Sequence, residues 1–171
     1  MQAGPIMNLT EHFTLEELTH SHTAVRLGID NAPAPELVAR LRVLASGLEE
    51  IRRILGRPVL VNSGYRCEAL EKVLCGKDYA SWCSRHQRNS ESAWPEYFQR
   101  KAHPRGYAAD FICPRFGTPA EIVKRLRQSG LKFDQLIEEG TWVHASFDPQ
   151  LRGELLVARF DRNGTPTYTS G

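Results

Sequence analysis

The stretch Lys101-Ala-His-Pro-Arg-Gly-Tyr-Ala-Ala-Asp-Phe111 is the one around which the rest of the chain is organised. It places His103 and Asp110 seven residues apart, with a turn at Pro104 and Gly106 between them and a strand after them. An imidazole nitrogen and a carboxylate oxygen are donors that zinc takes in proteins. The stretch therefore predicts a turn and a strand that bring two metal ligands together; a surface histidine before an ordinary strand is the alternative.

A second informative stretch, Phe133-Asp-Gln-Leu-Ile-Glu-Glu-Gly-Thr-Trp-Val-His-Ala-Ser-Phe147, has two apolar runs separated by Glu139-Gly-Thr. This pattern predicts a β-hairpin. His144 lies in the second strand and Glu139 at the mouth of the turn, so folding of the hairpin can bring the carboxylate near the imidazole. For His144 alone, a core histidine with satisfied hydrogen bonds is the alternative interpretation.

Upstream, Arg57-Pro-Val-Leu-Val-Asn-Ser-Gly-Tyr-Arg66 predicts a buried strand that ends in a polar turn. Functional side chains are often presented at such strand ends, and Arg66 is the candidate here. Its guanidinium offers a planar fork of donors that suits a carboxylate or a developing oxyanion. A surface ion pair is the alternative role.

Helices are predicted from caps and periodicity. Thr14 fits the N-cap of a short helix, and Thr118 fits the N-cap of a second one that carries Pro119 at its first position. Gly56 ends the most periodic helix, whose leucine and isoleucine stripe is typical of a core face. The stripe consists of Leu37, Leu41, Leu44, Leu48, Ile51 and Leu55.

Two segments are predicted to be less regular. Residues 68–101 show no clear period, and we interpret about 77–101 as an irregular insertion. Its interleaved arginines and aromatic residues could hold a polymer, or Trp82, Trp94 and Phe98 could pack against the domain. Residues 155–160 predict a final strand, followed by a turn and a loose C-terminus.

Length and composition narrow the class of protein. With 171 residues and 41% hydrophobic content, one core and a single domain over residues 1–171 are expected. The net charge of +2 argues against a nucleic-acid-binding protein. No apolar run approaches the roughly 20 residues of a membrane span, and the first residues lack an export signal. Whether translation starts at Met1 or Met7 stays open.

The four cysteines, Cys67, Cys75, Cys83 and Cys113, contain no Cys-x-x-Cys pair that would indicate a structural zinc site. Free thiols are expected in a protein without an export signal. A bridge between Cys75 and Cys83 is the alternative if the protein works outside the cytoplasm.

Three motifs together, Ser63-Gly-Tyr-Arg66, His103-x-x-Gly-x-Ala-x-Asp110 and Trp142-Val-His144, resemble the D-Ala-D-Ala carboxypeptidase family of zinc peptidases. That family also contains bacteriophage endolysins. Phe13-Thr-Leu-Glu-Glu-Leu18 and Gly28-Ile-Asp-Asn-Ala-Pro33 extend the resemblance, which covers roughly residues 10–150. It implies an α+β fold in which helices pack on one side of a small antiparallel sheet that carries a single zinc site.

The resemblance also implies site residues. His103, Asp110 and His144 are expected to be the zinc ligands, with an open fourth position as in catalytic zinc sites. Glu139 is the expected general base and acid; Glu138 is its rival, but strand alternation lets only one of them face the metal. The remaining expected roles are oxyanion or substrate-carboxylate contact for Arg66 and substrate binding for Ser63, Tyr65 and Trp142.

Three features depart from the pattern of the family. Lys101 stands where members often have Ser, Glu71 stands where they often have Asn, and the segment between Gly76 and Lys101 is longer than usual. None of these differences removes an expected ligand or the expected base. They bear on the choice of substrate.

The implied function is a zinc-dependent, endolysin-like peptidoglycan peptidase that hydrolyses an amide bond of the cell-wall stem peptide with zinc-activated water. The alternatives are a D-Ala-D-Ala carboxypeptidase or dipeptidase on small precursors, and a non-catalytic zinc-containing cell-wall-binding module. We expect a monomer made in the cytoplasm without membrane insertion. It would reach the wall through a holin lesion or from a virion.

Overall fold

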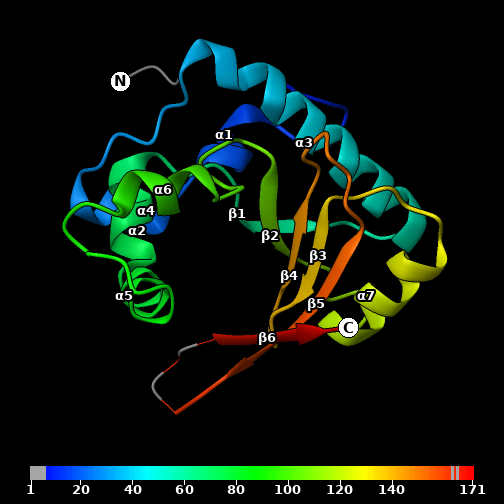
Figure 1. The fold of residues 1–171 in the computed structure, drawn as a ribbon. Coiled ribbons are helices and arrows are strands. Elements are labelled where there is room, and N and C mark those ends of the chain that lie inside the picture. The colour runs from blue at the N-terminus through cyan, green and yellow to red at the C-terminus, as the bar shows by residue number, and fades with distance from the viewer. Residues whose placement is uncertain (1–6, 163, 165) are drawn as a thin grey trace.

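The computed structural model describes residues 7–162, 164 and 166–171, which form the α+β architecture expected from the sequence (Figure 1). The helices of this part are α1 Leu15–Thr19, α2 His22–Leu27, α3 Pro35–Leu55, α4 Glu68–Leu74, α5 Gly76–Arg85, α6 Trp94–Gln99 and α7 Pro119–Gln128. The strands are β1 Leu60–Ser63, β2 Ala108–Ile112, β3 Gln135–Glu138, β4 Val143–Ser146, β5 Glu154–Phe160 and β6 Pro166–Ser170. The expectation that an export signal is missing concerns residues 1–6. These residues lie outside the described part.

The strands form one six-stranded sheet in the order β1-β2-β4-β3-β5-β6. The predicted hairpin is confirmed as β3 and β4. Neighbouring strands pair antiparallel except β3 and β5, which run parallel because the chain after β4 passes to the far side of β3. The sheet is therefore mostly, rather than wholly, antiparallel.

The long helix α3 and the helix α7 cover one face of the sheet (Figure 1). The predicted stripe of α3 is buried from Leu41 to Leu55, and the predicted end of the helix at Gly56 is confirmed by a backbone φ of 61°. Gly47 lets α3 approach the sheet, because a Cβ at this position would lie 2.4 Å from the ring of Phe147. This packing fixes the back of the sheet.

Alternate residues of β2 and β4 point to opposite faces of the sheet. Phe111 and Val143 are fully buried in the main core with the apolar residues of α3 and α7. Asp110 and His144, one residue away on each strand, therefore point to the opposite face. This alternation presents polar side chains on a face that α3 and α7 leave uncovered.

The segment expected to be irregular is helical. Helices α5 and α6 lie within residues 76–101 and, with α4, stand beside the uncovered face of the sheet (Figure 1). They bury a second, smaller cluster, which we call the insertion cluster. It consists of Cys75, Trp82, Cys83, Ala93 and Tyr97 with Tyr79 and Trp94 packed against it. Tyr79, Trp82 and Cys83 follow the three-and-four spacing of a helix face, a signal that the surrounding polar residues obscured.

Two further expectations were wrong in detail. The first strand is an edge strand whose Leu60 is exposed, so it is not buried as predicted. The C-terminus is not loose, because β6 pairs antiparallel with β5. The edge positions of β1 and β6 depend on strand order, which the sequence pattern does not reveal.

All four cysteines carry free thiols, as expected. Cys75 and Cys83 both lie in the insertion cluster, and burial raises the pKa of the Cys75 thiol to about 11. Within the described residues, no helix combines the length and apolar character that crossing a membrane requires.

Candidate metal centre

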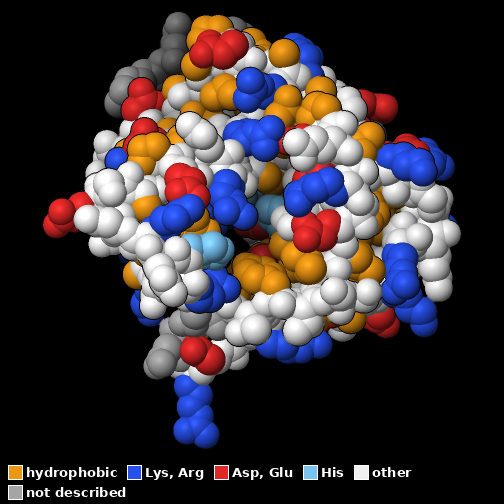
Figure 2. Space-filling model, viewed as in Figure 1, with side chains coloured by type: hydrophobic (Ala, Val, Ile, Leu, Met, Phe, Trp, Pro, Cys, Tyr) orange, Lys and Arg blue, Asp and Glu red, His pale blue; other side chains and the backbone are white. Residues whose placement is uncertain are grey.

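A cleft of about 1180 Å³ lies between the uncovered face of the sheet and the insertion helices. Strands β3, β5 and β6 contribute to one wall, and α4, α5 and the end of α6 contribute to the other. Figure 2 shows the hollow near the centre of the molecule, bordered by basic, acidic and apolar side chains. The three predicted ligands lie in this cleft.

The fold brings His103, Asp110 and His144 together through two local features. Asp110 and His144 are direct partners on neighbouring strands β2 and β4. His103 lies in the turn before β2, where Gly106 adopts a φ of 77° and its amide donates to the carbonyl of His103. A donor atom of each of the three lies within 4.8 Å of a donor atom of the others, and all three residues are buried.

The hydrogen bonds of His103 test whether this group suits a metal ion. Its Nδ1 lies 2.7 Å from the carbonyl oxygen of Gly64, which can only accept, so Nδ1 carries the proton. The neutral ring then turns an unprotonated Nε2 toward Oδ1 of Asp110 at 3.2 Å. Two acceptors face each other across this distance, and a cation would satisfy both.

The rest of the donor set fits the same interpretation. Oδ1 of Asp110 also lies 2.9 Å from Nδ1 of His144, so the three side chains converge on one point. Metal-bound histidines commonly donate their other ring nitrogen to a carbonyl, which fixes the orientation of the ring. The two imidazoles and one carboxylate therefore fit a catalytic zinc site.

Electrostatics favour the ligand forms of two of these groups. Burial lowers the pKa of His103, and the charge of Arg66 lowers it further. Burial alone would raise the pKa of Asp110, but His103, His144 and Arg66 hold it well below its usual range. A neutral imidazole and an ionised carboxylate are the forms that bind a metal.

Arg66 is held by the protein's own side chains. Its Nη2 donates to Oδ2 of Asp110 at 2.6 Å, its Nε donates to Oγ of Ser63 at 3.0 Å, and its Nη1 lies 3.5 Å from Glu71. Glu71 is only 2% exposed, so this pair is deep in the wall of the cleft. The guanidinium therefore orients the Asp110 carboxylate and neutralises a buried acid.

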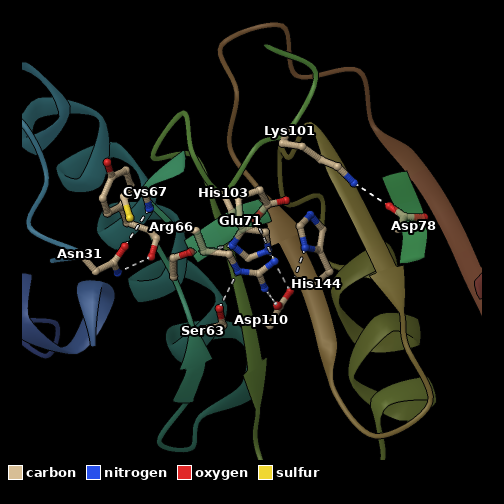
Figure 3. A network of polar contacts seen from close by, with 12 residues as sticks. Asn31, Ser63, Arg66, Cys67, Glu71, Asp78, Lys101, His103, Asp110 and His144 are labelled. Atoms are coloured by element: carbon tan, nitrogen blue, oxygen red, sulfur yellow. Dashed lines mark hydrogen bonds and ion pairs between the residues drawn. The ribbon is translucent and has the colours of Figure 1, made fainter. Parts of the chain in front are cut away.

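Asn31 fixes the turn that carries Arg66. Its side-chain amide donates to the carbonyl of Tyr65, and its side-chain oxygen accepts from the amide of Cys67 (Figure 3). The two residues that flank Arg66 are thus tied to the loop before α3. Gly64 adds to this support, because a Cβ there would lie 2.3 Å from the carbonyl oxygen of Leu18.

Glu139 lines the cleft at the end of β3, and its carboxylate accepts a 2.6 Å hydrogen bond from the indole of Trp142. Burial raises the pKa of Glu139, and the charge of Asp110 adds to the rise, while His144, Trp142 and Arg66 oppose it. A raised pKa suits a group that must both accept and release a proton. Its rival Glu138 lies 3.6 Å from Arg159 instead and does not line the cleft.

Comparison with known proteins supports the same interpretation of the site as a peptidase site. Residues 11–90 match the model of the Peptidase M15 family. This match covers just under half of the chain and supports the resemblance to that family. Neither a curated protein nor a solved structure matches it.

The match bears out the resemblance to the zinc peptidases and supports a metallopeptidase. The matched segment includes the turn at Arg66 and ends before the three residues that could hold a metal ion. The expected ligand set therefore rests on the chain's own geometry, in which His103, Asp110 and His144 form a group that could hold one ion.

The structure separates the predicted site residues into two groups. His103, Asp110, His144, Glu139, Arg66 and Trp142 all line the cleft. Among the described residues, Ser63 and Tyr65 are not part of its lining. Tyr65 is 8% exposed and packs in the main core, which does not support its predicted contact with substrate. Ser63 accepts a hydrogen bond from Arg66 and so holds this side chain in place.

The two residues that depart from the pattern of the family have structural partners. Glu71 faces Arg66, and Lys101 donates to Asp78 of α5 at 2.8 Å. Sequence reasoning did not single out two further residues of the cleft, Arg85 and Tyr168, which lie on α5 and β6. They carry no local motif, so only the fold could reveal them.

Proposed function

We propose that this chain is a zinc-dependent peptidoglycan peptidase that hydrolyses an amide bond of the stem peptide, and that residues 1–171 are one such domain. One observation carries the proposal. His103, Asp110 and His144 converge at the floor of a cleft that Glu139 also lines. A structural zinc site would need neither an adjacent carboxylic acid of raised pKa nor an open cleft.

In this proposal, His103 and His144 each give an imidazole nitrogen and Asp110 gives a carboxylate oxygen to the metal. Zinc held there would supply Lewis acidity, which activates water near neutral pH and polarises the scissile carbonyl. Arg66 keeps Asp110 ionised and oriented through the 2.6 Å hydrogen bond to Oδ2. The buried carbonyl of Gly64 keeps the proton of His103 on Nδ1.

Glu139 is the proposed proton carrier. Its carboxylate accepts a proton from the attacking water and delivers it to the nitrogen of the leaving amine. The hydrogen bond from Trp142 holds one carboxylate oxygen and leaves the other available. The oxyanion role expected for Arg66 stays a prediction, because its strongest contacts are to Asp110 and Ser63.

The shape of the cleft supports an endopeptidase over an enzyme for small precursors. Its volume of about 1180 Å³ exceeds the upper range of pockets for small ligands, and both walls extend beyond the metal centre. An extended peptide that is part of a polymer would fit such an open groove. A capped pocket would be expected for a dipeptidase.

The setting of the reaction is part of the proposal. We infer a monomer that acts on the cell wall after holin-type release or from a virion, without nucleic acid as a partner. The substrate is the peptide stem rather than the glycan, because the cleft presents the chemistry of a peptidase.

The test is mass spectrometry of fragments released from purified peptidoglycan by the protein alone, with a chelator, and with zinc restored. New peptide termini that vanish with the chelator and return with zinc are expected, and their sequence names the bond. Release of terminal D-Ala alone would replace the endopeptidase by a carboxypeptidase. No fragment from zinc-loaded protein would leave the non-catalytic module as the better account.

A further inference from the structure

The acidic side chains that line the cleft are already paired. Six of them form ion pairs with basic residues, and Glu139 accepts from Trp142. The pairs are Glu71 and Asp110 with Arg66, Asp78 with Lys101, Asp134 and Glu154 with Arg152, and Asp148 with Arg105. A substrate therefore meets few unpaired negative charges on these walls.

Arg85 differs from the basic residues in those pairs. It lies in the last turn of α5, is exposed, and lines the cleft. Within the described part of the chain, no acidic group forms an ion pair with it. Asp78 is the nearby acid whose pKa Arg85 helps to lower, but its Oδ2 already accepts from Lys101 and Tyr97. The guanidinium fork of Arg85 thus remains available to a ligand.

Tyr168 reaches the same cleft from the opposite wall. It lies on β6, opposite Ala158 of β5, and its side chain lines the cleft. Its hydroxyl has no hydrogen-bond partner among the described residues. Figure 1 shows that β6 begins on the side of the molecule that carries α5.

Both groups line one cleft, and the charge of Arg85 acts on the Tyr168 phenol. Burial raises the pKa of the Tyr168 phenol well above its usual value, and Glu139, Asp78 and Asp110 raise it further, while Arg85 opposes the rise. Charges on α5 and at the metal centre therefore both act on this hydroxyl. A phenol that stays neutral is a hydrogen-bond donor at every pH at which the enzyme would work.

We propose that Arg85 and Tyr168 form a subsite for a carboxylate of the substrate peptide. The guanidinium and the phenol would donate to the carboxylate from opposite walls and set the position of the peptide along the cleft. The inference rests on the proposed function and names its substrate class, which is an acidic peptide with its carboxylate on the side of α5 and β6. Arg66 is less available for this role, because its guanidinium already contacts Asp110, Ser63 and Glu71.

The experiment uses synthetic stem peptides in which each free carboxylate in turn is replaced by its carboxamide. With zinc-loaded wild-type protein, kcat/KM should fall roughly tenfold for one of these replacements, the effect of a lost charge-assisted hydrogen bond at a partly exposed site. Arg85→Gln should remove that discrimination between acid and amide, and Tyr168→Phe should weaken it. The double variant should lose no more than Arg85→Gln, because both groups serve one carboxylate.

Arg100→Gln is the matched control. Arg100 is also exposed, lines the same wall, and forms no ion pair within the described residues. If Arg100→Gln abolishes the discrimination as fully as Arg85→Gln, the general positive charge of the wall is responsible and the subsite is refuted. If Arg85→Gln keeps the wild-type discrimination, the subsite is refuted as well.

A second readout separates this inference from the proposed function. Calorimetric binding of the same peptides to metal-free protein should show the same acid-to-amide preference, and Arg85→Gln should lose it. If zinc-loaded protein cleaves no peptide while this binding preference holds, the peptidase fails and the subsite stands. Wild-type protein that cleaves the peptides without any preference overturns the subsite alone; protein that neither cleaves nor binds them overturns both.

Discussion

Asp110 is the residue on which the site depends. One of its carboxylate oxygens faces His103 and His144, and the other accepts from Arg66. Burial would favour the protonated form, yet three neighbours hold the pKa of this carboxyl well below its usual range. A single side chain thus joins the group that would bind metal to the arginine at the end of β1.

Glu139→Gln is expected to abolish hydrolysis and to leave zinc content unchanged. The amide keeps the shape of the side chain and can still pair with Trp142, but it cannot accept the proton of the attacking water. A loss of 10²-fold or more in kcat is expected for a general base. Fragment release and metal content by atomic absorption check the two parts.

The matched control for this variant is Glu138→Gln. Glu138 is adjacent in sequence but lies near Arg159 and outside the lining of the cleft. It should retain nearly full activity. If Glu139→Gln kept wild-type turnover, Glu139 would not be the general base. If Glu138→Gln lost more activity than Glu139→Gln, Glu138 would be the better candidate for the general base.

The turn after β1 shows how an element supports a side chain on another part of the chain. The carbonyl of Gly64 accepts from His103, and the same residue passes so close to α1 that no Cβ fits. The position of α1 therefore affects the orientation of His103 through the peptide group of Gly64.

Gly64→Ala should lower zinc affinity by about 10- to 100-fold and destabilise the fold by about 1–3 kcal/mol. The added methyl group would displace the turn from Leu18, and the carbonyl that orients His103 would move with it. Zinc titration against a competing chelator and urea unfolding measure the two effects. Gly76→Ala is the control, since nothing lies within 4 Å of a Cβ there; equal losses in both variants would contradict the role of the turn.

Helices α5 and α6 are joined to the turn before His103 through Asp78. Its carboxylate accepts from Lys101 and from the buried Tyr97, and the ammonium of Lys101 lies 4.3 Å from the ring centroid of Tyr97. Burial would raise the pKa of Asp78, but these partners lower it. Lys101, which departs from the pattern of the family, thus holds the insertion in place.

Asp78→Asn should destabilise the protein by about 1–3 kcal/mol at pH 7, since it breaks a largely buried network. A lowered pKa adds stability above the unfolded value of about 3.9, and this stability is lost as the pH falls through the folded value. The difference between wild type and variant should therefore shrink below about pH 4. Urea unfolding from pH 7 to pH 3 measures it.

Glu96→Gln is the control for this experiment. Glu96 pairs with Arg88 on the same insertion, but both side chains are about half exposed, so its loss should cost little. A difference for Asp78→Asn that stayed constant or grew on acidification would contradict the assigned direction of the pKa.

At the scale of the whole molecule, the candidate site lies between two apolar cores. The main core lies behind the sheet, and the insertion cluster lies across the cleft. A ligand that contacts both walls can bind only to the folded protein. Metal binding at this site should therefore raise the free energy of unfolding.

Metal removal should lower the melting temperature. An ion at 100 times its Kd stabilises the folded state by about 2.7 kcal/mol, which is roughly 5–10 °C for a chain of this length. Differential scanning calorimetry with chelator and with added zinc measures the shift. His144→Ala should show no zinc-dependent shift; an equal shift in that variant would place the ion elsewhere.

Sequence alone determined the features that depend on contacts between near neighbours. The caps at Thr14 and Thr118, the leucine face of α3 and the hairpin around Gly140 are set by residues a few positions apart. The ordered motifs also pointed to His103, Asp110 and His144, because ligand type and spacing remain visible in the chain.

Tertiary structure alone decided what depends on residues far apart in the sequence. The partners of Arg66, the burial of Tyr65 and the pairing of β6 with β5 follow from strand order and layer packing. The meeting of Arg85 and Tyr168 in one cleft has the same origin. Contacts between distant residues require the complete fold, and no local pattern of amino acids encodes them separately.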